Sequence, residues 1–249
     1  MRLLILGGTS EASALARALA GRADIAPVLS LAGRTADPAQ SAIPVRIGGF
    51  GGPNGLAEYL EAECIGAVVD ATHPFAAQIS GSAIAACEAT GVPLTQFTRL
   101  PWVPAPADDW RFVADLDEAA EAIGTDPQRV FLTSGRLGLA SFKAAPQHRY
   151  LLRSIDPPPR ADCPPACETL LARGPFEVES ERTLMRRHTI DVVVSKNSGG
   201  HAGAAKLEAA RSLGLRVIMV ERPPTMAIVD RFTDLDEVLG WIEAHRSAP

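Results

Sequence analysis

The chain begins with a buried-strand pattern that runs directly into a glycine turn. Residues 3–6 are all apolar, a glycine pair follows at 7–8, and the spacing of Leu15 and Leu19 predicts a helix immediately after the turn. A helix N-terminus that follows such a turn offers unpaired N–H groups and the positive end of the helix dipole, with Ser10 as the expected N-cap. The stretch therefore predicts a parallel α/β unit with an anion site at its first turn. An ordinary βα turn without a ligand is the alternative.

This turn departs from the G-x-G-x-x-G fingerprint of dinucleotide-binding folds. Gly8 comes early, and Ala12 stands where the third glycine belongs. Alanine is small enough for the close packing of helix on strand, so the departure is mild. We therefore assign the pyrophosphate of a dinucleotide to the turn and the first helical residues. The residues assigned to this cofactor site are Gly7, Gly8, Thr9, Ser10 and Glu11.

Strand and helix patterns alternate along the whole chain, which is typical of α/β proteins with parallel sheets. Three prolines within six residues of segment 101–109 interrupt the alternation and indicate a stiff connector. We therefore predict two tandem α/β domains, residues 1–100 and residues 101–249, with a cleft between them. Strands are expected at 3–6, 27–32, 43–47, 67–71, 93–98, 111–113, 129–133, 150–155, 191–195 and 216–220, and a charged helix is expected to open at 174–176 and to end near residue 189.

Composition excludes several classes of function. A net charge of −5 argues against general nucleic-acid binding, which needs a basic surface. No run approaches the roughly 18 apolar residues of a membrane span, and the apolar run at the start is too short for a signal peptide. Cys163 and Cys167 have no second pair to complete a zinc site, so no metal is expected. We therefore expect a soluble, cytoplasmic protein.

The end of the second expected strand indicates which dinucleotide would bind. Gly33, Arg34 and Thr35 follow that strand, and no carboxylate comes before Asp37. NAD sites usually present Asp or Glu there for the ribose hydroxyls, whereas a guanidinium and a hydroxyl suit a 2′-phosphate. The sequence therefore favours NADPH over NADH. A solvated surface arginine is the alternative for Arg34.

Thr72 and His73 end the fourth expected strand. In open parallel sheets, ligands bind where the strand order reverses, which for this half is between its first and fourth strands. We therefore expect both residues to face the glycine turn, close to a bound nicotinamide. His73 is a candidate catalytic residue on this ground, and a capping or packing histidine at a helix start is the alternative.

Two strand ends in the second half carry polar clusters suited to carboxylates or phosphates. Each combines small residues, unpaired N–H groups and one cation, and each precedes an expected helix. The chain has 21 Arg but only three Lys, and Lys196 is the one lysine outside a helical pattern. Simple turn chemistry is the alternative. The clusters comprise Ser134, Gly135 and Arg136 after one strand, and Lys196, Asn197, Ser198 and Gly199 after another.

A set of motifs spans nearly the whole chain in order. They are Ile-Leu-Gly-Gly-Thr-Ser-Glu-Ala at 5–12, Asp-Ala-Thr-His-Pro-Phe-Ala at 70–76, Arg-Leu-Pro-Trp at 99–102, Phe-Leu-Thr-Ser-Gly-Arg at 131–136, Gly-Pro-Phe at 174–176, Ser-Lys-Asn-Ser-Gly-Gly at 195–200 before Lys206, and Arg-Pro at 222–223. Together they resemble the precorrin-6A reductase family. The order of the motifs makes the resemblance far more specific than any single motif.

The resemblance implies an NADPH-dependent reductase of cobalamin biosynthesis with two Rossmann-like domains. Such enzymes deliver hydride to one carbon–carbon double bond of precorrin-6A, a tetrapyrrole polycarboxylate, and give precorrin-6B. The second-half clusters would then bind the carboxylates, with help from Arg99. His73 and Lys196 are the candidate catalytic residues, and His201, solvent and a substrate carboxyl remain open as proton donors. Hand-over to neighbouring pathway enzymes is a further expectation.

Other functions compete with this one. A two-domain enzyme that acts on tetrapyrroles or sugar nucleotides without reduction would have no use for Arg34, and a non-catalytic NADP sensor would need no site for a large anion. Neither Tyr59 nor Tyr150 has a lysine four residues later, as a short-chain dehydrogenase requires. G-x-S-x-G and H-E-x-x-H are absent from the sequence.

Overall fold

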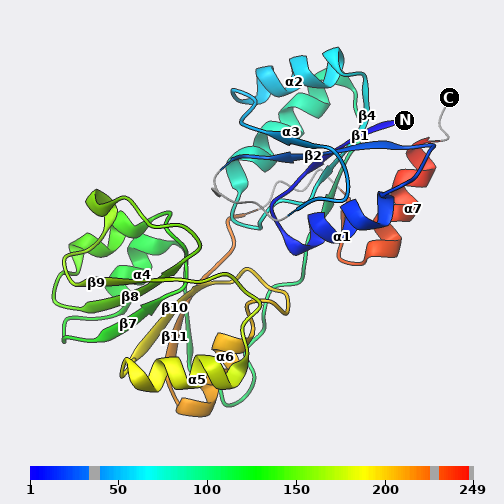
Figure 1. Ribbon diagram of the computed structural model, residues 1–249. Coiled ribbons are helices and arrows are strands. Elements are labelled where there is room, and N and C mark those ends of the chain that lie inside the picture. Colours follow the sequence, from blue (N-terminus) through cyan, green and yellow to red (C-terminus); the bar gives the residue numbers. More distant parts are fainter. Residues whose placement is uncertain (34–39, 225–229, 247–249) are drawn as a thin grey trace. The chain divides into compact units, whose positions relative to one another are not determined.

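A computed structural model describes residues 1–33, 40–224 and 230–246. The chain forms two compact units (Figure 1). The first unit comprises Met1–Leu100 and Pro223–Pro249, and the second comprises Pro101–Arg222. The division therefore differs from the expected one, because the C-terminal segment belongs to the first unit. The reason is that strand β12 (Arg231–Phe232) pairs with β5 (Leu94–Phe97) of the first sheet.

The first unit is built on a six-stranded parallel sheet in the order β12-β5-β4-β1-β2-β3. Strand order reverses between β1 and β4, which confirms the predicted position of the reversal. The remaining strands are β1 (Arg2–Leu6), β2 (Ala26–Leu31), β3 (Val45–Ile47) and β4 (Ile65–Asp70). The helices are α1 (Ser10–Leu19), α2 (Pro53–Ala62), α3 (Ala77–Thr90) and α7 (Leu235–Arg246).

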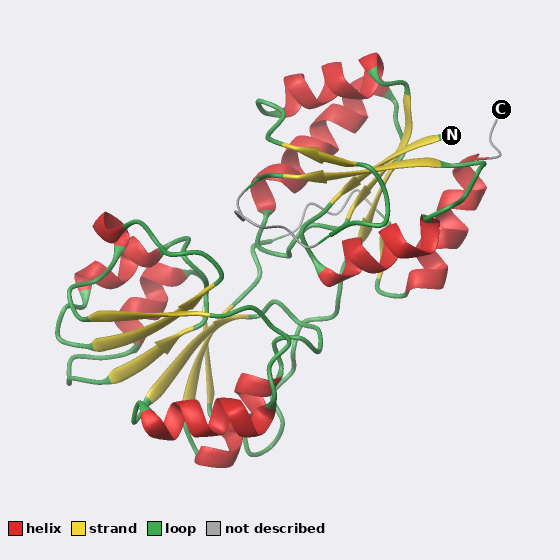
Figure 2. Ribbon diagram, viewed as in Figure 1, coloured by secondary structure: helices red, strands yellow, loops and turns green. Residues whose placement is uncertain are grey.

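Two layers of helices cover this sheet (Figures 1 and 2). Side chains of a strand alternate between its faces, so Leu3 and Ile5 of β1 enter the core beneath α1 and α7. Leu4 and Leu6 enter the opposite core, beneath α2 and α3. Since both faces are buried, residues 3–6 of the strand are all apolar, which is why the strand could be recognised in the sequence.

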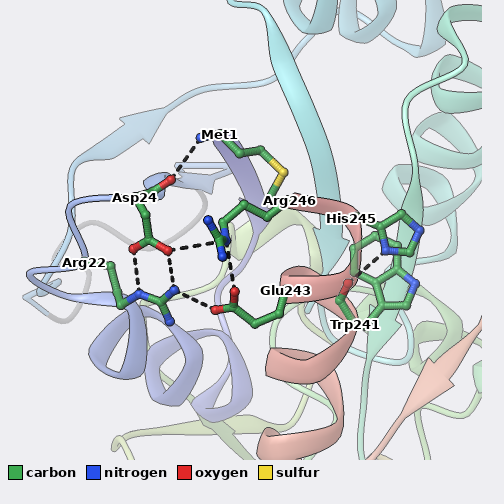
Figure 3. A network of polar contacts seen from close by, with 7 residues as sticks. All are labelled: Met1, Arg22, Asp24, Trp241, Glu243, His245 and Arg246. Carbon is green, nitrogen blue, oxygen red and sulfur yellow. Dashed lines mark hydrogen bonds and ion pairs between the residues drawn. The ribbon is translucent and has the colours of Figure 1, made fainter. Parts of the chain in front are cut away.

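The C-terminal helix α7 is held by apolar and by charged contacts. Its Val238, Trp241 and Ile242 are buried in the core shared with α1. Arg22 donates to both carboxylate oxygens of Asp24, at 2.8 and 2.5 Å, and to Glu243 of α7 at 2.6 Å (Figure 3). The hydrogen bonds from Arg22 hold the pKa of Asp24 below its ordinary value. Exposed ion pairs stabilise little, so the apolar contacts account for most of the attachment.

The second unit has its own six-stranded parallel sheet in the order β6-β11-β10-β7-β8-β9, which reverses between β7 and β10. Helices α5 and α6 cover one face of this sheet. Helix α4 and the short 3₁₀ helix η1 pack against each other on the side of the sheet away from α5 and α6 (Figure 1). The strands are β6 (Trp110–Val113), β7 (Arg129–Leu132), β8 (Arg149–Ser154), β9 (Cys167–Leu171), β10 (Val192–Lys196) and β11 (Arg216–Val220). The helical segments are α4 (Leu116–Ala122), η1 (Leu139–Ala144), η2 (Arg160–Asp162), α5 (Val178–Arg187) and α6 (Ala205–Leu213).

The two sheets have corresponding strand orders. In each, one edge strand leads into a helix that is capped by an aspartate. Asp115 Oδ1 accepts from two backbone amides of α4, both at 2.9 Å. Asp234 Oδ1 accepts from two amides of α7, at 2.8 and 3.3 Å. The repeated Asp-Leu-Asp-Glu stretches therefore mark equivalent strand–helix elements of the two units.

The second unit differs from the sequence-based expectation at two places. Strand β9 was not expected, because an edge strand that is half exposed has no continuous apolar run. The helix expected to open at 174–176 begins at Val178, and the Gly-Pro-Phe stretch is a loop before it.

None of the described helices has the length and apolar character needed to cross a bilayer. Likewise, no group of three His, Cys, Asp or Glu side chains in this part of the chain could hold a metal ion.

Candidate functional site

Thr9 joins the glycine turn to the neighbouring strand β4. Its hydroxyl donates to the Ala71 carbonyl at 2.6 Å, directly after β4, and accepts from the Ala12 amide at 3.1 Å. Thr9 is therefore the N-cap of α1, and the expectation that Ser10 fills this role is wrong. The reason is backbone geometry, because Thr9 is extended (φ −125°, ψ 170°) and Ser10 is the first helical residue.

The two glycines of the turn have different physical roles. A Cβ on Gly7 would lie 2.4 Å from Leu29 Cδ1 and 3.1 Å from the Ala12 methyl, so Gly7 allows the helix to approach the sheet. Gly8 has φ +111° and open space where a side chain would project. The Ala12 methyl thus fills space beside Gly7, and the turn leaves its outer side open for a ligand.

Glu11 and Arg99 form an ion pair at the entrance to the turn. Arg99 Nη1 donates to Glu11 Oε2 at 2.8 Å, and the Ser10 hydroxyl donates to the same oxygen at 3.1 Å. Glu11 lies in the first turn of α1, where its negative charge would oppose a phosphate unless it were neutralised. Arg99, expected at the substrate, thus has its partner in the first unit, beside the predicted cofactor site.

Thr72 is held by a buried carboxylate that the sequence reasoning missed. Asp70 Oδ1 accepts from the Thr72 amide at 3.0 Å and from its hydroxyl at 2.6 Å. Asp70 Oδ2 accepts from Gln96 Nε2 at 3.2 Å, and Gln96 Oε1 accepts from Arg231 Nε at 2.9 Å. A chain of hydrogen bonds therefore runs from the edge strand β12 to the end of β4 and fixes Thr72 beside the sheet reversal.

His73 makes local hydrogen bonds within the turn that precedes α3. Its Nδ1 accepts from the Phe75 amide at 3.2 Å, and its carbonyl accepts from the Ala76 amide at 2.7 Å, just before α3. The N-cap of α3 is Ala76, without a side-chain hydrogen bond, so the capping role named as the alternative is not observed. The Nδ1 contact orients the ring, and a catalytic role for His73 stays a prediction.

The end of β2 is described only in part. Gly33 has φ +70°, and a Cβ there would lie 3.1 Å from Ile47 Cγ2, so the turn favours glycine. Arg34 and Thr35, predicted to hold the 2′-phosphate, lie outside the described residues. The nearby Arg46 donates to the carbonyls of a glycine-rich loop, at 2.6 Å to residue 48 and 2.8 Å to residue 49, and its guanidinium carbon lies 3.8 Å from the centroid of the Phe50 ring.

In the second unit, the two predicted clusters follow β7 and β10, the strands on either side of the reversal. After β7, Ser134 is buried, and its hydroxyl has no hydrogen-bond partner within the part of the chain that the structure describes. Gly135 has φ +74°, which turns the chain between Ser134 and Arg136. A buried hydroxyl without a partner is costly, so Ser134 is suited to a ligand that supplies the missing bond.

Lys196 is the last residue of β10, and we call the segment from it to residue 203 the lysine loop. Burial lowers the pKa of Lys196 at its start. The Asn197 side chain, expected to bind substrate, instead pairs with the backbone of Trp102, accepting from its amide at 2.7 Å and donating to its carbonyl at 3.1 Å. Its amide group therefore fixes the loop in place.

Both chain segments that connect the units bind the lysine loop. Trp102, after the first crossing, donates from its indole Nε1 to the Gly200 carbonyl at 3.0 Å. Arg222, before the second crossing, donates to the carbonyls of Asn197 and Ser198 at 2.9 and 3.1 Å. Lys206 Nζ lies 4.7 Å from the centroid of the Trp102 ring. The loop thus has a defined shape before any ligand is considered.

The cluster after β10 precedes an α-helix as expected, whereas the cluster after β7 does not. Helix α6 begins only at Ala205, after Gly199 and Gly200 have turned the chain with φ values of +69° and +77°. The cluster after β7 leads to η1, a single short 3₁₀ segment. Anion binding here would therefore depend on side chains and loop amides, with little help from a helix dipole.

Comparisons with known sequences and solved structures give matches over nearly the whole chain. A model of the family described as "Precorrin-6x reductase CbiJ/CobK" matches residues 2–243. The chain is 50% identical over 248 residues to a precorrin-6A reductase of Rhodobacter capsulatus, covering 100% of this chain and 98% of that relative. A precorrin-6A reductase of Rhodococcus erythropolis is 49% identical, with 97% of each chain covered. A solved structure described as "CobK precorrin-6A reductase" matches with a TM-score of 0.93 at 50% identity, covering 100% of this chain and 98% of that one.

Proposed function

This chain belongs to the precorrin-6x reductase family, and on that premise we propose that its first unit binds NADPH and its second unit binds precorrin-6A through the carboxylates. The protein is an oxidoreductase of cobalamin biosynthesis that reduces precorrin-6A. When bound, NADPH supplies the hydride for one carbon–carbon double bond, and the product is precorrin-6B. The residues of this chain bind NADPH and precorrin-6A, orient them toward each other and deliver the proton.

The observation that carries the cofactor proposal is the bond between Thr9 and Ala71. It joins the turn after β1 to the end of β4, the two strands at the reversal of the first sheet. The amides of Ser10 and Glu11 lie in the first turn of α1, where N–H groups have no intrahelical partner. The close approach at Gly7 and the open side of Gly8 leave room for a pyrophosphate over these amides.

The preference for NADPH is assigned to the segment after β2. Ser30 near the end of β2 is in register with Leu6 of β1, so the residues that follow β2 are next to the glycine turn in the sheet. Gly33, Arg34 and Thr35 follow there without a carboxylate that would repel a 2′-phosphate. We assign the adenosine 2′-phosphate to Arg34 and Thr35.

The nicotinamide is assigned to the end of β4, beside Thr72 and His73. The Asp70 carboxylate fixes the Thr72 backbone and hydroxyl, so this edge of the site is rigid before the cofactor binds. His73 Nε2 and the Lys196 ammonium are the two proposed proton donors. Burial lowers the pKa of Lys196, which makes its ammonium a stronger acid than an exposed lysine.

The carboxylates of precorrin-6A are assigned to the ends of β7 and β10. Ser134 offers an unpartnered hydroxyl, and the nearby cations are Arg136 and Lys196. The amides of residues 198 and 199 belong to the lysine loop, which Asn197 holds against Trp102. Arg99, paired with Glu11, is assigned to the cofactor side of the reaction.

Affinity for the two nicotinamide cofactors tests the proposal. Fluorescence titration should give tighter binding of NADPH than of NADH, and Arg34→Glu should abolish the difference. Arg17→Glu, in an exposed position on α1, is the matched control and should keep the preference. Equal affinity of the unaltered protein for both cofactors would refute the assignment of NADPH. Preference retained in Arg34→Glu would remove Arg34 from its role.

Turnover assays test the reaction, the proton donor and the transfer of the product. NADPH absorbance should fall only when precorrin-6A is added. The reduction needs one proton, so the alkaline limb of the pH–rate profile should be lost in whichever of His73→Gln and Lys196→Gln removes the proton donor. We also propose that the enzyme works in the cytoplasm and passes precorrin-6B directly to the next enzyme. Free precorrin-6B accumulating in a coupled reaction at matched enzyme concentrations would contradict the direct transfer.

A further inference from the structure

Arg153 is a buried cation near the carboxyl end of β8, and it has no role in the cofactor and substrate sites proposed above. Its side chain is 7% exposed, and its Nη1 donates to Glu181 of α5, which is 2% exposed. Its guanidinium carbon lies 5.0 Å from the centroid of the Phe131 ring in the core beneath α5 and α6. The sequence reasoning treated Arg153 only as part of a strand.

Phe176 covers the same guanidinium from another side. Its ring centroid lies 3.7 Å from the guanidinium carbon of Arg153. A Cβ on Gly174 would lie 3.2 Å from the Phe176 ring and 3.5 Å from the Ala202 carbonyl, so this loop packs close to the lysine loop. The Gly-Pro-Phe stretch therefore covers Arg153 and lies beside residues proposed to bind substrate.

The partners of Arg153 leave part of its hydrogen-bonding capacity unused. A guanidinium has five N–H donors, and aromatic faces attract its charge without accepting a full hydrogen bond. Among the described residues, Glu181 is the one hydrogen-bond acceptor of Arg153, and the two rings are its other contacts. Glu181 Oε2 is also buried without a partner. The pair is thus positioned firmly but is not fully satisfied.

The strand register brings Arg153 level with the proposed substrate residues. Leu152 is in register with Leu132 of β7, which is in register with Val194 of β10. Arg153 is one residue past this row, so its side chain projects to the face covered by α5 and α6, like those of Leu151 and Phe131. Ser134 and Lys196 are two residues past the row on neighbouring strands, and Lys196 projects to the opposite face, so only the backbones of the three residues are close in register. Adjacent strands lie about 4.8 Å apart, so the three residues sit at one edge of the sheet within roughly 10 Å.

We propose that Arg153 binds a carboxylate of the substrate, held in place by Glu181 and covered by Phe176. This inference rests on the proposed function, because it adds a residue to the substrate site of the second unit. Glu181 fixes one edge of the planar guanidinium, and the free donors on its other nitrogens match the two oxygens of a carboxylate. Phe176 excludes water from one face and strengthens the interaction.

The test is the affinity of purified protein for precorrin-6A, measured by equilibrium titration without turnover. The double variant Arg153→Met with Glu181→Met removes both charges together, because a buried pair replaced by apolar residues of similar size usually leaves folding intact. We expect affinity for precorrin-6A to fall roughly 10- to 100-fold, as for loss of a hydrogen bond to a charged group. Affinity for NADPH should be unchanged. The substrate affinity of the variant should also depend less steeply on salt.

Arg149→Met is the matched control, since Arg149 is exposed at the amino end of the same strand. It should keep the affinity of the unaltered protein for precorrin-6A. Unchanged precorrin-6A affinity in a folded double variant would overturn the proposal, and so would an equal loss in Arg149→Met. Failure of the unaltered protein to bind NADPH would instead refute the proposed cofactor and leave the substrate titration interpretable. If the double variant does not fold, Arg153→Lys with Glu181 intact takes its place under the same criteria.

Discussion

Replacing Thr9 by valine tests whether the bond between the glycine turn and β4 stabilises the first unit. Valine keeps the shape of threonine but removes the hydroxyl that bonds the Ala71 carbonyl at 2.6 Å and the Ala12 amide at 3.1 Å. Loss of an N-cap costs about 1 kcal/mol. Leaving the buried Ala71 carbonyl unpaired costs about 1–2 kcal/mol more. We therefore expect the free energy of unfolding of the first unit to fall by about 2–3 kcal/mol.

Urea unfolding followed by circular dichroism gives the measurement. A ligand stabilises only the unit that binds it, so under the proposed assignment of NADPH the transition that it shifts to higher urea belongs to the first unit. Thr9→Ser is the control, because serine retains a hydroxyl and the capacity for both bonds. We expect the NADPH-sensitive midpoint to fall in Thr9→Val and to stay close to the original in Thr9→Ser. Coincident midpoints for the two variants would refute the reasoning.

Two further predictions concern stability. Ile242→Ala removes a fully buried side chain of α7 and should lower the free energy of unfolding of the NADPH-sensitive transition by about 2–4 kcal/mol. Arg246→Ala, at an exposed position of the same helix, should leave the urea midpoint nearly unchanged. Equal effects of the two variants would contradict a mainly apolar attachment of α7. Burial alone would raise the pKa of Asp108, but hydrogen bonds from Arg211 and the Ala105 amide hold it below 3.8. Its stabilisation is therefore present above pH 3.8 and is lost as pH falls below that value, so urea titrations at several pH values should show Asp108→Asn flattening the acid side of the stability profile.

Sequence reasoning recovered the features that have a local cause. The run at residues 3–6 is apolar because both faces of β1 are covered, and the order of strands around the reversal follows from ordinary α/β connections. The polar clusters after β7 and β10 were found because hydroxyls, glycines and a cation follow directly after buried strands. These features are the predictable part of the fold and of the site.

The features that were missed depend on contacts between distant parts of the chain. The amide of Asn197 bonds a backbone 95 residues earlier, so its sequence neighbours could not show that it holds a loop. Asp234 caps α7, but no neighbouring residue in the sequence shows that this helix covers the first sheet. Arg153 resembled an ordinary strand residue because its partners, Glu181 and Phe176, come from a later helix and loop.

The return of the chain to the first unit sets an order for folding during synthesis. The second unit is continuous from residue 101 to residue 222, so its whole sheet is available once those residues have left the ribosome. The first unit lacks β12 and α7 at that time, and the core that receives Trp241 and Ile242 stays uncovered. A nascent chain arrested just after residue 222 has left the ribosome should therefore carry a folded second unit and a first unit that is still open to protease.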